Sequence, residues 1–393
     1  MGQYTRCATI TDLVSNFLLF TKRVQSIESI TVASTALLWC LVMEISDLNI
    51  LSISFAIGKF LAVTPHSLDV KQNRRCQKIY SLFMCTAITV GLSVTYCYRI
   101  PFYKNFDLIK LTIHVFLDIC LYAFNFYTTI VVTFCREQQW QVLVSNLQTI
   151  ECTTPKHSFI KWFAVANVLY WALMLGTIWT WIVNFGVEYY KQYVMDAVQL
   201  YSKFIYIYLI CAILNMFLKR YREIRRLIKN IFSENDNHLL FIKVKYNIWG
   251  LRQSIEAFNQ IFGWPILFVI LYSCLRILIY MDLLIDSQKN LGIGITIVNV
   301  GILVVLFVGS VVIIVSCDAI LEEGETIVRL LSKYRYSANG GRNDEVKILS
   351  GMMKDNFPEF SAARFFSIDR TTIFGILQSI TTFFIILIQF NFA

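Results

Sequence analysis

The stretch that decides the fold is TTFFIILIQF, residues 381–390. With the preceding TTIFGILQSI (371–380), it forms an apolar run of the length that a helix needs to cross a bilayer, roughly 20 residues. A membrane-spanning helix does not need Gln389, because lipid disfavours a polar side chain. The reason for the glutamine has to come from the rest of the chain.

The composition is typical of a protein that crosses the membrane several times. Of the 393 residues, 56% are apolar and 16% are charged, whereas soluble domains average about 45–50% and about 25%. Several of the 11 cysteines lie inside apolar runs, and no CxxC motif occurs. We therefore interpret the cysteines as small buried apolar residues and predict no disulfide framework and no metal site.

Seven apolar stretches are long enough to span a membrane as helices. They run near residues 79–98, 108–134, 162–185, 200–218, 261–284, 291–315 and 371–392. The apolar run 30–42 is too short, and the segment after it carries Lys59 and stops at Pro65. We interpret residues 30–68 as an interfacial or re-entrant helix rather than a span.

The basic residues predict how these helices are oriented, because Lys and Arg collect in cytoplasmic loops. With the N-terminus inside, 27 of the 35 Lys and Arg fall on the cytoplasmic side and only four fall in the opposite loops. We therefore predict an all-α polytopic membrane protein with seven transmembrane helices, a cytoplasmic N-terminus and an extracellular C-terminus. The net charge of +9 then needs no nucleic-acid partner.

Three amphipathic stretches lie on the predicted cytoplasmic side, at residues 219–229, 237–265 and 318–334. One interpretation of KRYREIRRLIK (219–229) is a basic helix end whose side chains reach out of the membrane. The alternative is that the three stretches pack together, because each has an apolar face to bury. We favour this cytoplasmic helical bundle.

The end of the chain resembles that of insect gustatory receptors, which close on Thr-Tyr, five apolar residues and Gln-Phe. Here Thr382, Gln389 and Phe390 match the motif, residues 384–388 match the apolar five, and Phe383 replaces the tyrosine. Three further stretches are similar to the family: FNQIFGWPILF (258–268), AILEEGETIVRLL (319–331) and FFSIDR (365–370).

The resemblance implies a ligand-gated, non-selective cation channel that passes Na⁺, K⁺ and Ca²⁺ and is opened by a tastant. It implies a homotetramer, or a heterotetramer with related receptors, among the lipids of a sensory neuron's plasma membrane. The tastant would be a plant secondary (bitter) compound or a sugar. Phe384 stands where the sugar-receptor branch usually has Glu, which disfavours that branch. No cofactor is implied.

This resemblance gives each part of the chain an expected role. Residues 1–78 would form the cytoplasmic N-terminus with its interfacial helix. Residues 79–316 would hold helices one to six and the ligand site, with 219–260 as cytoplasmic extensions. Residues 317–370 would complete the cytoplasmic anchor, and 371–393 would line the pore.

The seventh stretch carries its polar and small residues on one helical face. Spacing of four and three residues joins Thr371, Gly375, Gln378, Thr382, Ile385 and Gln389. From the residues alone, this stripe fits a water-filled pore and close packing against another helix equally well. The resemblance favours the pore, with Ile386 or Phe390 as an apolar gate and Gln389 as a polar ring near the extracellular mouth.

Candidate ligand-binding residues are polar and aromatic side chains in the outer halves of the predicted helices. They are His114, Asp118, Trp179, Trp181, Tyr193, Arg276, Tyr280 and Asn299. An aromatic pocket would stack on rings and orient them with a few hydrogen bonds. The alternatives are an aromatic belt at the membrane surface and a structural ion pair between Asp118 and Arg276.

Other function classes fit the sequence less well. A seven-helix G-protein-coupled-type chemosensory receptor would have its N-terminus outside, against the charge count. Neither a DRY-like triplet after the third span nor an NPxxY in the seventh occurs. The sequence contains no HExxH motif, no GxSxG motif and no pair of intramembrane aspartates that would suggest an enzyme. We therefore predict no catalytic residues. A transporter would show an internal repeat, and we find none.

Overall fold

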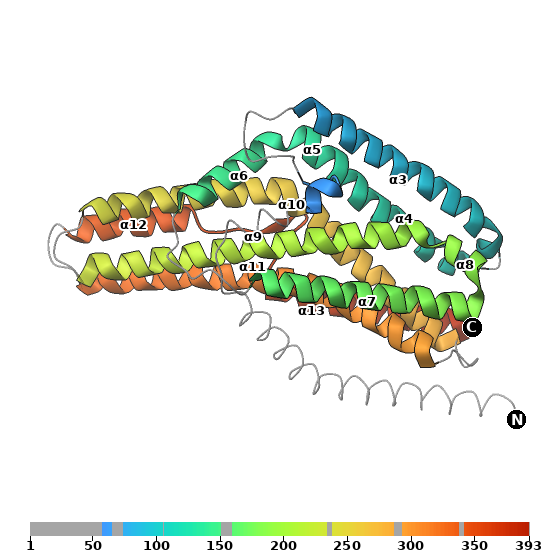
Figure 1. Ribbon diagram of the computed structural model, residues 1–393. Coiled ribbons are helices and arrows are strands. Elements are labelled where there is room, and N and C mark those ends of the chain that lie inside the picture. Colours follow the sequence, from blue (N-terminus) through green and yellow to red (C-terminus); the bar gives the residue numbers. More distant parts are fainter. Residues whose placement is uncertain are drawn as a thin grey trace, which may run out of the picture.

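The computed structural model describes residues 57–64, 74–104, 106–150, 159–233, 238–286, 293–337 and 342–392, almost entirely as helix. Figure 1 shows the arrangement. The predicted interfacial or re-entrant segment 30–68 lies mostly outside these residues. Only its part at 57–64 is described, as a short helical turn followed by a bend.

The chain forms a succession of helices that is interrupted by one small hairpin. The helices are α3 (Arg74–Tyr103), α4 (Leu108–Phe126), the π-helical turn η1 (Tyr127–Val131), α5 (Val132–Cys135), α6 (Glu137–Thr149), α7 (Phe159–Phe185), α8 (Val187–Lys191), α9 (Val194–Ser233), α10 (His238–Asp286), α11 (Ile293–Ser337), α12 (Arg342–Asp355) and α13 (Arg370–Phe392). Strands β1 (Ser361–Ala362) and β2 (Phe366–Ser367) pair antiparallel just before α13.

The described part of each predicted apolar stretch lies within one helix or, for 108–134, within the run from α4 to α5. Residues 291 and 292 of the sixth stretch lie outside the described residues. By length and composition, six helical segments of the described chain could cross a membrane. They are Arg75–Pro101, Leu108–Cys135, Phe163–Asn184, Val194–Phe232, His238–Asp282 and Val300–Arg335. The described apolar part of α13, Arg370–Ile386, is shorter. The seventh crossing and the orientation of the termini stay predictions.

The helices form an elongated bundle, shown in Figure 1. The long helices α9, α10 and α11 run along it and meet α12 at one end. At the other end, α3, α4, α7 and α8 join them and widen the bundle. The most enclosed helix is α9, where every residue from 205 to 217 is buried, as expected for a helix that is apolar on all sides. In contrast, α3 and α7 expose apolar side chains along much of their length.

The three amphipathic stretches pack against one another at the α12 end of the bundle. Ile224 and Ile228 of α9, Val244 of α10 and Ile327 of α11 are each fully buried in one continuous core. The rings of Phe232 and Tyr334 stack with centroids 4.0 Å apart. The apolar face of each amphipathic stretch is therefore buried, as its pattern predicts. The cytoplasmic location of this end stays a prediction.

The hairpin of β1 and β2 is held against α10. The Asn259 side chain donates to the carbonyl of Glu359 at 2.6 Å and accepts from the N–H of Ser361 at 3.2 Å. Gly263 makes the close approach possible, because a Cβ there would lie 2.9 Å from the backbone nitrogen of Ala363. The rings of Trp264 and Phe365 also meet, with centroids 5.7 Å apart, so two of the family-like stretches, 258–268 and 365–370, contact each other shortly before α13.

Candidate functional site

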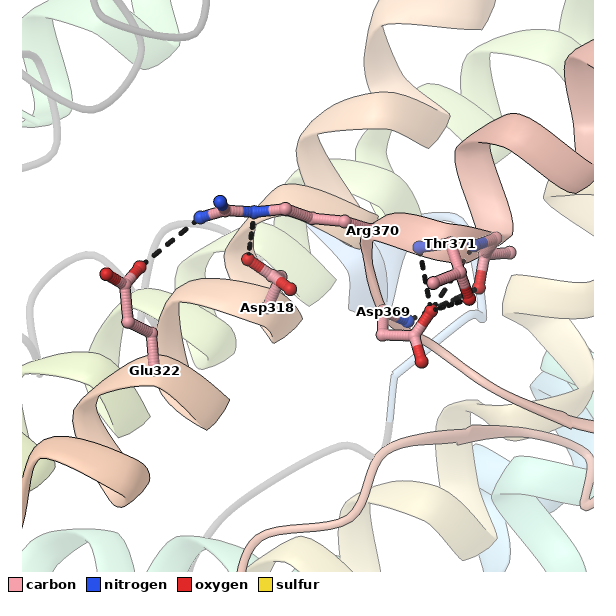
Figure 2. Close-up of polar contacts among 6 residues, drawn as sticks. Asp318, Glu322, Asp369, Arg370 and Thr371 are labelled. Carbon is pink, nitrogen blue, oxygen red and sulfur yellow. Dashed lines mark hydrogen bonds and ion pairs between the residues drawn. The ribbon is translucent and has the colours of Figure 1, made fainter. Parts of the chain in front are cut away.

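Helix α13 starts at a side-chain cap. Asp369 Oδ1 accepts hydrogen bonds from the N–H groups of Thr371 at 2.9 Å and Thr372 at 3.3 Å, as Figure 2 shows. A carboxylate at this position satisfies N–H groups that have no partner inside the helix. Hydrogen bonds from Thr371 and the neighbouring backbone lower the pKa of Asp369. The cap fixes the first turn of α13 immediately after the hairpin.

The next residue ties α13 to α11. Arg370 pairs through Nε with Asp318, and its Nη2 lies 3.3 Å from Glu322 Oε2 (Figure 2). Asp318 and Glu322 are four residues apart on α11, so they lie on the same face of that helix. The two acidic residues therefore hold one end of α13 from the side, just where its apolar run begins.

Helix α13 has two different faces. It packs mainly against α10 and α11, and its side facing them is apolar: Ile380 and Phe384 are buried, and Ile373 and Ile376 are half-buried. The predicted polar stripe lies on exposed positions of the single chain, at Thr371, Gly375, Gln378, Thr382, Ile385 and Gln389. Packing within one chain therefore leaves the stripe uncovered.

Apart from Gly375 and Ile385, the stripe consists of polar side chains that water or another polar surface could contact. Thr382 donates back to the carbonyl of Gln378 at 2.9 Å. The side-chain amide of Gln378 has no hydrogen-bond partner among the described residues. Of the predicted gate residues, Ile386 is 37% exposed. The side chain of Phe390 is not among those that the structure describes.

A cavity of about 330 Å³ opens between α3, α4, α7, α9, α10 and α11, at the α8 end of the bundle. Most of the predicted ligand residues line it: His114, Asp118, Trp181, Tyr193, Arg276 and Tyr280. Trp179 does not, and 72% of its surface is exposed on the outside of α7. The side chain of Asn299 is not among those that the structure describes. Helices that are far apart in the sequence thus line one internal cavity.

Asp118 is paired with Arg99, which corrects the expected pairing with Arg276. Arg99 donates to Asp118 Oδ2 at 2.7 Å and to Asp196 Oδ2 at 2.5 Å, and only 4% of its side chain is exposed. Tyr103 also donates to Asp118, at 2.9 Å. The reason is that α3 continues to Tyr103, beyond the predicted end at 98, and carries Arg99 back into the bundle beside α4.

Aromatic side chains form much of the remaining cavity wall. Trp181 and Tyr193 meet edge to face with ring centroids 5.5 Å apart, and Tyr193 also stacks under the Arg99 guanidinium at 4.6 Å. The His114 ring lies 4.9 Å from that of Phe106. These rings offer flat apolar surfaces next to a few charged groups, which is the usual makeup of a small-molecule site.

Sequence reasoning missed Arg99, Tyr103, Asp196 and Tyr272 as cavity residues. Arg99 and Asp196 were assigned to loops because they fall at the ends of apolar runs. A usable signal was present, since a charge within a turn of a span is often buried with a partner. Tyr272 gave no such signal, because it lies in the middle of an apolar run with nothing to mark which way it faces.

The fold and the cavity define the class: a helical membrane protein with an internal cavity lined by aromatic and charged side chains. A family model described as 7tm Chemosensory receptor matches residues 51–393. The chain therefore belongs to this family, which comprises insect odorant and gustatory receptors.

Solved structures agree with this assignment at the level of fold. The olfactory receptor OR5 of the insect Machilis hrabei in complex with eugenol superposes with a TM-score of 0.61 at 13% identity, covering 88% of this chain and 100% of that one. A second structure of the same Machilis hrabei receptor superposes with a TM-score of 0.60 at 13% identity, covering 86% of this chain and 97% of that one. No curated protein sequence matches the chain.

Proposed function

We propose that this chain is a gustatory receptor that works as a ligand-gated, non-selective cation channel in the plasma membrane of insect sensory neurons. Within a chemosensory family, the gustatory role is supported by the ending Thr382 to Phe390, which matches the motif of that branch apart from Phe383. The ligand would be a non-volatile tastant such as a plant secondary compound or a sugar.

The observation that carries the channel proposal is the uncovered stripe of α13. Gln378, Thr382 and Gln389 are exposed on a helix whose opposite face packs against α10 and α11. Lipid contact would leave the glutamine amides without hydrogen bonds, and an unsatisfied polar group in hydrocarbon costs several kcal/mol. Four chains placed around one axis would instead turn their stripes to a common water-filled path, through which Na⁺, K⁺ and Ca²⁺ would pass.

The cavity is the proposed ligand site. Its volume of about 330 Å³ lies at the lower end of the range for ligand pockets, roughly 300–1,000 Å³. Ile302 and Leu303 of α11 line it, and the same helix continues without a break to Asp318 and Glu322, which hold Arg370. This connection supports coupling between a bound tastant and α13.

The remaining assignments follow from the charge distribution and the family. The N-terminus and the bundle around α12 would lie in the cytoplasm as an anchor, and the cavity would lie in the extracellular half. Assembly would be homotetrameric, or heterotetrameric with related receptors.

A cysteine-accessibility experiment tests the pore. Gln378→Cys, Thr382→Cys and Thr381→Cys are expressed in cells that lack such receptors, and a water-soluble thiol reagent is applied during ligand-evoked currents. Thr381 is the matched control, because it is also an exposed threonine of α13 but lies off the stripe. We expect block at positions 378 and 382 and none at 381 or in the native chain. Equal modification at all three positions, or currents that require G-protein turnover, would contradict the channel proposal.

A further inference from the structure

The described lining of the cavity holds three basic and three acidic side chains, but the ion pairs between them are unevenly distributed. Three acidic side chains line it among the described residues, and each is already bound. Asp118 and Asp196 share the guanidinium of Arg99. Asp282 lies 3.4 Å from Lys110 Nζ. No carboxylate of the described lining is left for a further cation.

Because two carboxylates share Arg99, Arg276 is the basic side chain of this described lining without a direct ion pair. It lines the cavity from α10 and makes no hydrogen bond or ion pair with any described residue. A second cation lies close by, because Lys203 of α9 is 1% exposed with its Nζ 3.7 Å from the centre of the Tyr272 ring. Among the described groups, Lys203 Nζ has no hydrogen-bond partner. Tyr272 itself lines the cavity, so a second basic side chain lies just behind this part of the wall.

A charge inside a membrane bundle is costly unless it has a partner. Arg276 keeps five N–H donors in a planar fork that fits a carboxylate in a bidentate arrangement. Tyr272 and Tyr280 flank it at four residues before and after, which puts all three on one face of α10. The arrangement therefore offers one anion-binding fork between two aromatic side chains.

We infer that the natural ligand carries a carboxylate or a comparable monoanionic group, that Arg276 binds this group, and that Tyr272 and Tyr280 contact the ligand body. This rests on the proposed function, because it specifies the chemical class of ligand for the same cavity. The class is a compact organic acid rather than a neutral sugar or a cationic alkaloid. The pairing of all three described acids argues against a cationic ligand, since none is free to receive it.

The test compares acids with their amides on the purified full-length protein in detergent. The probes are cinnamate against cinnamamide and hexanoate against hexanamide, pairs of nearly equal size that differ in charge. Affinity is read from the shift in melting temperature with ligand concentration. We expect at least one carboxylate to bind the native protein roughly 10- to 100-fold more tightly than its amide, the size of a charge-assisted hydrogen-bonded pair.

Two variants locate the effect. Arg276→Gln should remove the preference for the carboxylate, and Arg276→Lys should keep part of it. If Arg276→Gln does not fold, the inference is still tested by Arg276→Lys and by the comparison of acids with their amides on the native protein. Equal or tighter binding of the amides, binding of neither member of each pair, or the same stabilisation by chloride alone would overturn the inference. These readings need no ion conduction, so they are independent of the cysteine-accessibility result that tests the channel.

Discussion

The Arg99 guanidinium lies 2.7 Å from the Asp118 carboxylate, so α3 is joined to α4 inside the cavity. The same guanidinium reaches Asp196 of α9, and one side chain thus connects three helices around the proposed ligand site. Removing it would leave two carboxylates together in the bundle with no cation between them.

Arg99→Met should therefore prevent normal folding. Breaking a buried ion pair from one side costs about 3–5 kcal/mol, a large share of a typical folding free energy of about 5–15 kcal/mol. We expect loss of surface expression, measured by labelling of intact cells. The control is Arg329→Met. The side chains of Arg329 and its partner Glu325 are 75% and 55% exposed, so their ion pair should contribute little to stability. Normal surface levels of Arg99→Met would contradict a structural role for the cluster.

The two tryptophans at the end of α7 should behave differently. Trp181 lines the cavity, whereas Trp179 is 72% exposed on the outside. Trp181→Leu removes aromatic surface from the ligand site, so the ligand concentration for half-maximal current should rise roughly tenfold, equivalent to about 1.4 kcal/mol. Trp179→Leu should leave it unchanged. Equal effects of the two changes, in dose–response recordings at matched surface expression, would show that the aromatics act as a membrane belt instead.

The glycine beneath the hairpin should not tolerate a methyl group. In Gly263→Ala the new Cβ would lie 2.9 Å from the backbone nitrogen of Ala363, and either the hairpin or α10 would have to move. We expect a loss of about 1–3 kcal/mol, seen as a lower melting temperature of the purified protein.

The matched control is Gly351→Ala in α12, where a Cβ would meet nothing within 4 Å. Alanine should stabilise a helix at such a position by about 0.5–1 kcal/mol. Two variants with the same chemical change should therefore move the melting temperature in opposite directions. A neutral Gly263→Ala would mean that the hairpin does not rest on α10 as described.

The pairing of Arg370 with Asp318, drawn in Figure 2, should affect opening rather than ligand binding. Asp318→Asn weakens the link between α11 and α13, and we expect the ligand sensitivity of the current to change about two- to fivefold, as for partly exposed pairs worth about 0.5–1 kcal/mol. Ligand-induced melting shifts should stay the same. The double change Asp318→Arg with Arg370→Asp should restore part of the response, and failure of any rescue would show that the contact plays no part in gating.

Helix positions were the most predictable part of the fold. Runs of about 20 apolar residues leave few alternatives in a membrane protein, and the described part of each predicted span lies within a helix or a continuous helical run. Helix lengths were less predictable. The amphipathic stretches predict helices beyond the apolar runs, but the sequence does not mark where those helices end, such as Ser233 for α9 and Ser337 for α11.

The cavity shows where sequence reasoning reaches its limit. Trp179 and Trp181 are the same residue type, two positions apart near the end of α7. Only the rotation of α7 against its neighbours puts one inside the cavity and the other outside. The partner of Asp118 was predicted wrongly for a similar reason, because Arg99 enters the bundle only if α3 continues past 98. Rotation and helix ends depend on packing between distant segments, and a single sequence reports them weakly.

The two-faced α13 also has a consequence for how the receptor is made. If four chains assemble as proposed, a newly inserted chain would present Gln378 and Gln389 to lipid until the others arrive, so the solitary subunit should be the less stable species in the bilayer. Receptor abundance would then rise more steeply than in proportion to synthesis, and a surplus of unassembled chains would be exposed to degradation. Reaching the cell surface would in that case already select for complete assemblies.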